Sequence, residues 1–117
     1  MDTQFSAEDL AFQAEVRQFF KDNYTAEVQA NLANLGTYKQ TQIEWQKLLF
    51  NKGWIAPGWP QEFGGTGWTD TQKFIFSTER SSAGAPDVVP FGLKMVGPVI
   101  YAFGNDEQKQ RFLPGIL

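Results

Sequence analysis

One pair of neighbouring side chains has the residue types that proton chemistry uses. Glu79 lies next to Arg80, a carboxylate beside a guanidinium, late in a predicted helix. Such groups can act as acids or bases when their surroundings perturb them, but most perturbed charged groups are structural. Adjacent residues of a helix also point in different directions. We therefore interpret the pair as a surface or structural ion pair rather than as catalytic groups.

A glycine-rich run has the composition of a phosphate-binding loop. Residues 64–67 read Gly-Gly-Thr-Gly and lie directly before a predicted helix. Their spacing matches neither G-x-G-x-x-G nor the pattern that ends in G-K-[ST], and no predicted strand comes before them. We interpret the run as a glycine turn that leads into a capped helix.

Residue types that are missing limit the chemistry further. The 117 residues include no Cys and no His. Disulfides, thiol nucleophiles, thiolate metal sites and a Ser–His pair are therefore excluded. The sequence predicts no catalytic residue and no metal ligand, and it leaves the cofactor-binding residues unknown.

The charge balance excludes two classes of partner. Ten basic residues face 13 acidic ones, a net charge of −3, whereas nucleic acids and anionic membranes attract basic surfaces. The chain has no run of about 18 apolar residues that could span a bilayer. Its first residues also lack the charged and apolar regions of a signal peptide. We expect a cytoplasmic protein without a membrane span.

Apolar spacing predicts an all-α domain of four to six helices, with no sheet, over residues 1–117. No segment alternates apolar and polar residues at period two, as a half-buried strand would. The longest helix is expected at about residues 7–23, where Ser6 and Asp9 form a box-like start. A short helix within residues 26–35 and a helix over about residues 40–52, closed by Gly53, follow.

The second half of the chain has two further helix starts. Thr69 and Gln72 form a capping box, as do Asn105 and Gln108. The first box predicts a helix that ends near Gly84, and the second a helix that reaches about Leu113. Between them we expect a helical turn near residues 88–95 and a helix that restarts at Pro98 and reaches Phe103. The side chains expected on the buried side of the helix after Thr69 are Phe74, Ile75 and Thr78.

Residues 53–68 contain three of the four tryptophans in a segment rich in glycine and proline. That composition excludes a long helix. We expect Trp54, Trp59 and Trp68 to hold the loop against the domain by packing, with direct ligand contact as the alternative.

Four segments, taken in order, carry a family resemblance. They read W-I-A-P with W-P-Q-E-F-G-G-T-G-W-T at residues 54–69, R-S-S-A-G-A-P at 80–86, F-G-L-K-M-V-G-P-V-I at 91–100, and F-G-N-D-E-Q-K-Q-R-F-L-P at 103–114. Together they resemble the N-terminal region of flavin-dependent acyl-CoA dehydrogenases. The most distinctive piece is the P-x-E-x-G-G-x-G run that begins at Pro60.

The resemblance implies an enzyme much longer than 117 residues. Such enzymes have an N-terminal helical domain, a middle β-domain and a C-terminal four-helix bundle. The last two domains hold most of the FAD, and the last carries the glutamate base. We therefore expect a chain that is truncated after Leu117, binds no FAD alone and is inactive alone.

The helical domain of this family contributes a wall of the acyl pocket beside the flavin. By position in the resembling segment, the substrate-binding residues are Val89, Phe91, Leu93 and Met95. Apolar side chains suit an alkyl tail, whose burial is worth about 0.8 kcal/mol per CH₂ group. The alternative is that these four side chains fill the core of the domain itself.

The activity that the resemblance implies is FAD-dependent oxidation of an acyl-CoA to its α,β-unsaturated thioester. The resemblance also implies an electron-accepting flavoprotein as partner and a homo-oligomeric assembly. Two alternatives stay open, namely a stand-alone helical interaction module and a non-catalytic subunit that pairs with a separate catalytic chain.

Overall fold

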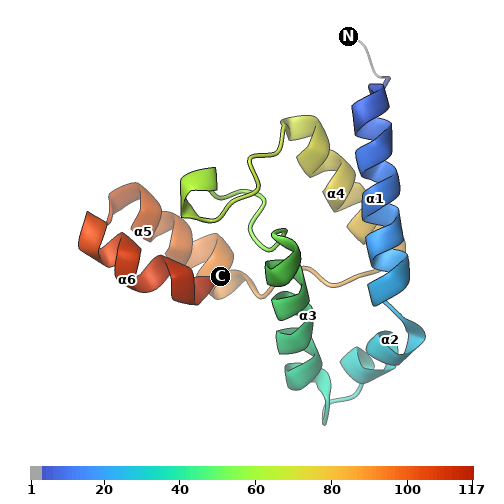
Figure 1. Ribbon diagram of the computed structural model, residues 1–117. Coiled ribbons are helices and arrows are strands. Elements are labelled where there is room, and N and C mark those ends of the chain that lie inside the picture. Colours follow the sequence, from blue (N-terminus) through green and yellow to red (C-terminus); the bar gives the residue numbers. More distant parts are fainter. Residues whose placement is uncertain (1–3) are drawn as a thin grey trace. The chain divides into compact units, whose positions relative to one another are not determined.

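The computed structural model describes residues 4–117, and within them it contains helices and no strand (Figure 1). The all-α prediction of four to six helices is confirmed, and the longest helix is the first. The helices are α1 (Ala7–Asn23), α2 (Ala26–Ala33), α3 (Tyr38–Lys52), α4 (Asp70–Ala83), α5 (Gly97–Phe103) and α6 (Asp106–Ile116), with a 3₁₀ turn η1 (Gln61–Phe63) and a π-helical segment η2 (Phe91–Val96).

Side-chain caps explain where three of these helices begin. Ser6, Thr69 and Asn105 each accept a hydrogen bond from the backbone N–H three residues later, and each box is closed reciprocally. These contacts satisfy donors that a helix start leaves unpaired. The predicted bounds of α1 are therefore confirmed. Helix α6 runs past the expected end near Leu113 to Ile116, because Pro114 falls in the last turn and removes only one late hydrogen bond.

The described chain forms two structural units. The first unit comprises residues 4–42 and 68–87, and the second unit comprises residues 43–67 and 88–117. Each unit is treated below by itself. The expectation that residues 1–117 form one domain stays a prediction.

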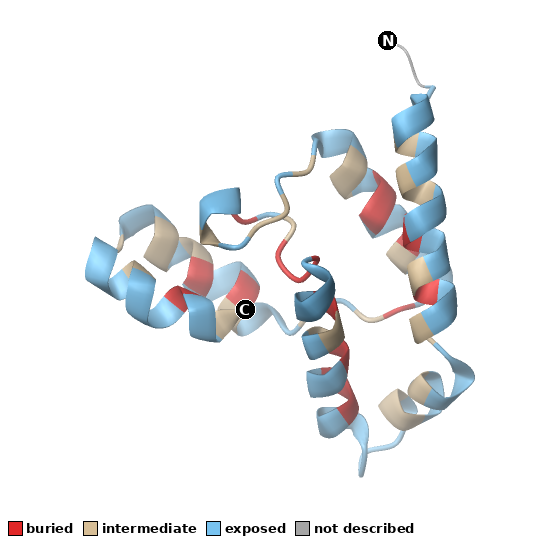
Figure 2. Ribbon diagram, in the orientation of Figure 1, coloured by how far each residue is buried: buried red, intermediate tan, exposed pale blue. Residues whose placement is uncertain are grey.

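The first unit packs α1 against α4 through large apolar side chains (Figure 2). The rings of Phe20 and Phe76 lie 5.7 Å apart, and the ring of Trp68 lies 5.1 Å from that of Phe12. Trp68 is half-buried, so it packs over this core as expected of the tryptophan loop. Aromatic rings bury large apolar areas, so they dominate the packing energy of such a core.

The predicted buried side of α4 is confirmed for Ile75 and wrong for Phe74 and Thr78. Ile75, Phe76 and Glu79 are buried, whereas Phe74 is 62% exposed and Thr78 is exposed. In the structure Glu79 pairs with Arg17 of α1, so the buried side of α4 is centred one position later than predicted.

The second unit has its core around the tryptophan loop. Trp54 and Trp59 are buried, as predicted, and Trp59 contacts Leu93 and Gly97. The buried side chains of this unit are Trp45, Leu49, Trp54, Ile55, Ala56, Trp59, Leu93 and Leu113. Among residues 4–117, no helix is long and apolar enough to cross a bilayer.

Candidate functional site

The segment before α5 is wound as a π-helix rather than as the isolated helical turn that was predicted. In η2 the backbone hydrogen bonds span five residues, and the last of them runs from the N–H of Gly97 to the carbonyl of Gly92. A π segment within a helix is rare and is often found at a functional site. Its cause here can be traced through the next backbone groups.

The carbonyl of Leu93 has no backbone donor available in this register. Its donor in a π-helix would be residue 98, which is proline and has no N–H. Its donor in an α-helix would be Gly97, whose N–H is already bonded to Gly92. The indole Nε1 of Trp59 fills the gap and donates to the Leu93 carbonyl over 2.7 Å in a buried position. An unsatisfied buried carbonyl is thereby avoided.

Two glycines make room for Trp59. A Cβ at Gly97 would overlap the ring atom Cζ2 of Trp59, and a Cβ at Gly65 would overlap the Trp59 carbonyl oxygen. The ring of Tyr101 packs edge-on against the indole with centroids 5.7 Å apart. Trp59 is therefore held from several sides, so its N–H has a fixed direction toward Leu93.

The glycine run is occupied by the chain itself. Gly64 and Gly67 have φ values of +104° and +68°, which favour glycine. The space that Gly65 leaves open is taken by the carbonyl of Trp59, and that of Gly67 by the side chain of Gln61. These contacts confirm a turn before α4. The N–H groups of Gly64 and Gly65 are bonded within the turn, to the carbonyls of Gln61 and Pro60, so these two groups do not form an open cradle for the pyrophosphate of FAD.

The predicted substrate-binding residues lie at different depths. Leu93, within η2, is buried. The side chains of Val89, Phe91 and Met95 are exposed, and that of Phe91 is 68% exposed. The N–H of Val89 donates to Oε1 of Gln46 over 2.8 Å, which fixes the start of this segment on α3. Three of the four side chains are thus available to a ligand, and the fourth packs in the core of the unit.

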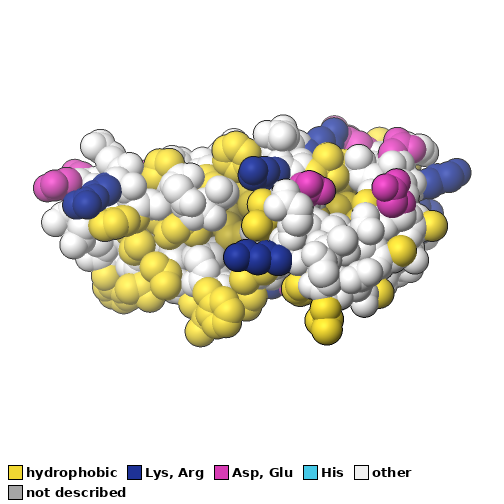
Figure 3. Space-filling view, turned by 90° about the horizontal axis from the view of Figure 1, so that it is seen from below, with side chains coloured by type: hydrophobic (Ala, Val, Ile, Leu, Met, Phe, Trp, Pro, Cys, Tyr) yellow, Lys and Arg dark blue, Asp and Glu magenta, His cyan; other side chains and the backbone are white. Residues whose placement is uncertain are grey.

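Sequence reasoning missed two members of the same exposed face. Val99 is 58% exposed and Phe103 is 86% exposed, and they follow Phe91 and Met95 at spacings of four. We call Phe91, Met95, Val99 and Phe103 the apolar stripe. No local signal could have joined them to the stripe, because residues four apart drift by about 40° at each step of an α-helix. Figure 3 shows apolar side chains gathered over the part of the chain that holds α5 and α6.

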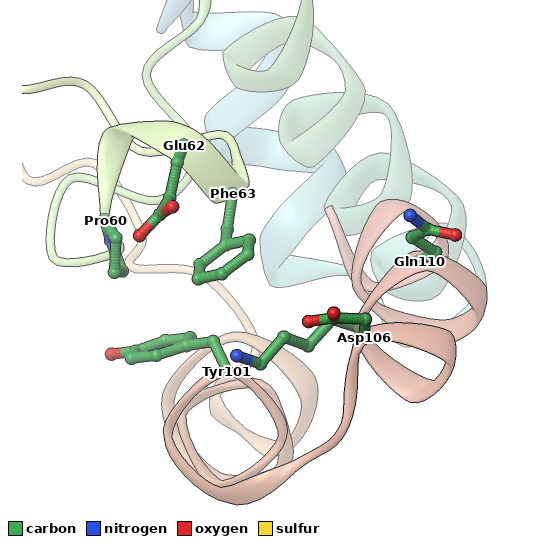
Figure 4. Close-up of a pocket in the computed structure, with 7 residues that line it drawn as sticks. Pro60, Glu62, Phe63, Tyr101, Asp106 and Gln110 are labelled. Carbon is green, nitrogen blue, oxygen red and sulfur yellow. The ribbon is translucent and has the colours of Figure 1, made fainter.

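A cavity of about 380 Å³ lies between η1, α5 and α6 in the second unit (Figure 4). The rings of Phe63 and Tyr101 stack with centroids 6.0 Å apart, and Nζ of Lys109 lies 5.3 Å from the Phe63 ring. Lys109 lies in a charged stretch of α6 and is half-buried. The cavity is lined by Pro60, Glu62, Phe63, Tyr101, Asp106, Lys109 and Gln110. A cation held on an aromatic face stabilises packing. We therefore interpret the residues around this cavity as structural and not as a ligand site.

The first unit buries a carboxylate that sequence reasoning paired with the wrong partner. Oε2 of Glu79 accepts from Nε of Arg17 over 2.9 Å, and Oε1 accepts from Nε2 of Gln13 over 3.2 Å. Arg80 instead donates to the carbonyl of Ala85, past the end of α4. The expectation of a structural ion pair holds for Glu79, with Arg17 in place of Arg80. No signal in the sequence joins residues 62 positions apart.

The described residues show no metal centre, since no three Asp or Glu side chains among residues 4–117 group to hold an ion. The two features that remain for a functional role are the apolar stripe and the buried tryptophan that supports its first turn. Apolar surface of this kind suits a hydrophobic ligand or a protein neighbour.

Comparison with known proteins places these features in a family. A family model for the N-terminal domain of acyl-CoA dehydrogenases matches residues 6–117. The acyl-CoA dehydrogenase FadE26 of Mycobacterium tuberculosis is 39% identical over 106 residues, which cover 87% of this chain and 26% of that protein.

Two solved structures share the fold. One chain of the ChsE4–ChsE5 complex of Mycobacterium tuberculosis superposes with a TM-score of 0.79 at 34% identity, over 99% of this chain and 29% of that one. A chain of the steroid ACAD Tcur3481–Tcur3483 superposes with a TM-score of 0.76 at 30% identity, over 99% of this chain and 30% of that one. The chain therefore spans between a quarter and a third of the length of these relatives.

Proposed function

The chain belongs to the acyl-CoA dehydrogenase family, whose N-terminal domain it matches, and we propose that it serves as that domain in an FAD-dependent enzyme. The enzyme would oxidise an acyl-CoA to its α,β-unsaturated thioester. The observation that carries the proposal is the exposed apolar stripe on a chain with this family match.

In this proposal η2 forms part of the wall of the acyl pocket. Val89, Phe91 and Met95 would contact the acyl group, and Leu93 would support them from the core. Each CH₂ group that the wall removes from water contributes about 0.8 kcal/mol. A dry wall also strengthens electrostatic interactions at the reacting carbons.

FAD belongs to other parts of the enzyme in this proposal. The glycine run is filled by Trp59 and Gln61 and does not fit a pyrophosphate. We expect residues 1–117 alone to bind no FAD tightly and to have no dehydrogenase activity. The electrons would pass to a separate electron-accepting flavoprotein, and the cytoplasm is the proposed compartment.

The substrate class we propose is a CoA thioester with a bulky, apolar acyl group. Support comes from the structural relative Tcur3481–Tcur3483, which is a steroid ACAD. The aromatic side chains of Phe91 and Phe103 offer flat apolar surface, which suits a fused-ring group.

A second candidate function is that of one subunit in a pair of different chains. Both structural relatives are named for two different chains, ChsE4 with ChsE5 and Tcur3481 with Tcur3483. The assembly would then be a hetero-oligomer instead of the homo-oligomer that the family resemblance implies. The catalytic residues could lie on either of its two chains.

The proposal is tested on the full-length chain, purified with any subunit that accompanies it. Butanoyl-, hexadecanoyl- and cholanoyl-CoA are supplied with ferrocenium as electron acceptor, and the unsaturated thioester is measured by mass spectrometry. We expect oxidation of cholanoyl-CoA, and an increase in KM of about 10-fold for Phe91→Ser, since one apolar group is worth one to two decades of binding.

A matched control uses another exposed phenylalanine. Phe74 is 62% exposed, close to the 68% of Phe91, but it lies on α4 of the first unit. Phe74→Ser should leave KM unchanged. Absence of any oxidised thioester with the purified assembly would rule out the proposed activity.

A further inference from the structure

Trp59 connects the core of the second unit to the register of its exposed face. Its indole N–H is the donor for the Leu93 carbonyl, at 2.7 Å in a buried position. The proline at position 98 removes the backbone donor that the π register would otherwise supply. The π turn is thus satisfied only with the help of a side chain 34 residues away.

The π turn decides which side chains share a face. In an unbroken α-helix, residues four apart drift by about 40° at each step, because each residue turns by about 100°. Phe91 would therefore lie about 80° from Val99. The wider π turn holds more residues, so four residues fall short of a full turn and offset the drift of the α-helical step that follows. Phe91 is thereby brought close to the direction of Val99, and the apolar stripe becomes narrower.

Pro98 disfavours the alternative, α-helical register, because its ring would meet the carbonyl of Lys94 four residues earlier. If the indole N–H were absent, the Leu93 carbonyl would therefore lose its donor and find no replacement in the backbone. The π turn would then open more readily, and Phe91 would lose its fixed direction.

We propose that Trp59 is a positioning residue for acyl recognition, because its hydrogen bond to Leu93 holds the π turn that aligns the apolar stripe. The inference rests on the proposed function, since it takes the stripe as the acyl wall. Trp59 is buried and acts through η2, so its removal changes substrate selection rather than the reacting groups.

The test compares Trp59→Phe with Trp54→Phe in the full-length chain and any accompanying subunit. Both residues are buried tryptophans of the second unit, and it is the indole of Trp59 that donates to the Leu93 carbonyl. For Trp59→Phe we expect KM for cholanoyl-CoA to rise about 10-fold with kcat within twofold, since misplacing binding groups costs one to two decades. For Trp54→Phe we expect KM to stay within twofold.

A readout independent of activity is amide hydrogen exchange in the peptide that covers residues 91–97. Trp59→Phe should raise its exchange rate more than that of α6, and Trp54→Phe should not. Equal exchange and equal KM in the two variants would overturn the proposal. A wild-type enzyme that oxidises no thioester would overturn the proposed function instead, and hydrogen exchange would still decide whether Trp59 holds the turn.

An isostere covers the case in which Trp59→Phe does not fold. Benzothienylalanine at position 59 keeps the size of the indole and removes only the N–H. The same rise in KM and in exchange at residues 91–97 is expected. Wild-type values with this residue would show that the hydrogen bond positions nothing.

Discussion

In the first unit the buried acceptor is the carboxylate of Glu79, and in the second unit it is the backbone carbonyl of Leu93. Each is satisfied by a donor from a distant segment, Arg17 in one unit and Trp59 in the other. The Arg17 side chain is 63% exposed, so its pair is open to water at one end. Trp59 is enclosed, and its bond fixes the register of a helix.

The difference shows that a buried polar contact can either stabilise the packing of two helices or fix the backbone geometry of one helix. Losing the Arg17 contact would lower stability, because the buried carboxylate of Glu79 would lose a charged partner. It would not alter either helix, because α1 and α4 keep their own backbone hydrogen bonds. Losing the Trp59 contact would leave the Leu93 carbonyl without its donor and loosen the π turn that carries part of the apolar stripe. We therefore propose that the functional surface of the chain lies in the second unit.

The largest effect is expected for Trp59→Ala. It removes a buried indole and leaves the Leu93 carbonyl unpaired, so the free energy of unfolding should fall by about 4 kcal/mol. Urea unfolding followed by circular dichroism measures this change. A loss of less than about 0.5 kcal/mol, typical of surface positions, would show that Trp59 is not a core anchor.

Arg17→Met should cost less. The substitution keeps the aliphatic stem but leaves the buried carboxylate with Gln13 alone, which should lower the free energy of unfolding by about 2 kcal/mol. Lys47→Met, at an exposed position of α3, is the matched control and should change stability by less than about 0.5 kcal/mol. Equal effects of the two substitutions would mean that the pair with Glu79 contributes nothing.

Gly53 and Gly84 test whether the two units differ at helix ends. Each has a positive φ, +84° and +73°, and each would place a Cβ in open space. Alanine at either position should therefore cost the same, about 1 kcal/mol of backbone strain. Gly115→Ala, in α6 and also in open space, should instead raise stability by about 0.5 kcal/mol. Thermal unfolding of the three variants gives the comparison, and unequal costs at Gly53 and Gly84 would contradict it.

The smallest stability effect is expected in the apolar stripe. Phe91→Ser combined with Phe103→Ser should change the free energy of unfolding by less than about 0.5 kcal/mol, because both side chains are exposed. The isolated chain should self-associate through this surface, and the double variant should do so less. Sedimentation velocity over a concentration series checks both. A wild-type chain that stays monomeric would contradict the role of the stripe in association.

Local signals explain what could be predicted from the sequence. The boxes at Ser6, Thr69 and Asn105 fix three helix starts because each uses contacts within three residues. The wall residues Phe91 and Met95 could be proposed from the family resemblance, but their exposure and the burial of Leu93 depend on the π register. That register follows from Pro98 together with Trp59, a contact that no local pattern encodes.

Distant contacts account for the errors. Glu79 was paired with its neighbour Arg80, but its partner Arg17 lies on another helix, and Phe74 and Thr78 were wrongly placed on the buried side of α4. Lys109 belongs to a charged stretch of α6, yet it lies over the ring of Phe63. In both cases a side chain from elsewhere in the chain overrides the local pattern.

The most direct test of the second unit as the acyl wall is photolabelling with an acyl-CoA that carries a diazirine on its acyl chain. The full-length chain, with any accompanying subunit, is irradiated with the probe and digested, and labelled peptides are mapped by mass spectrometry. Our account predicts label within residues 88–103, reduced by competing cholanoyl-CoA and by Phe91→Ser. Label confined to peptides of the first unit, or absent from this chain, would contradict it.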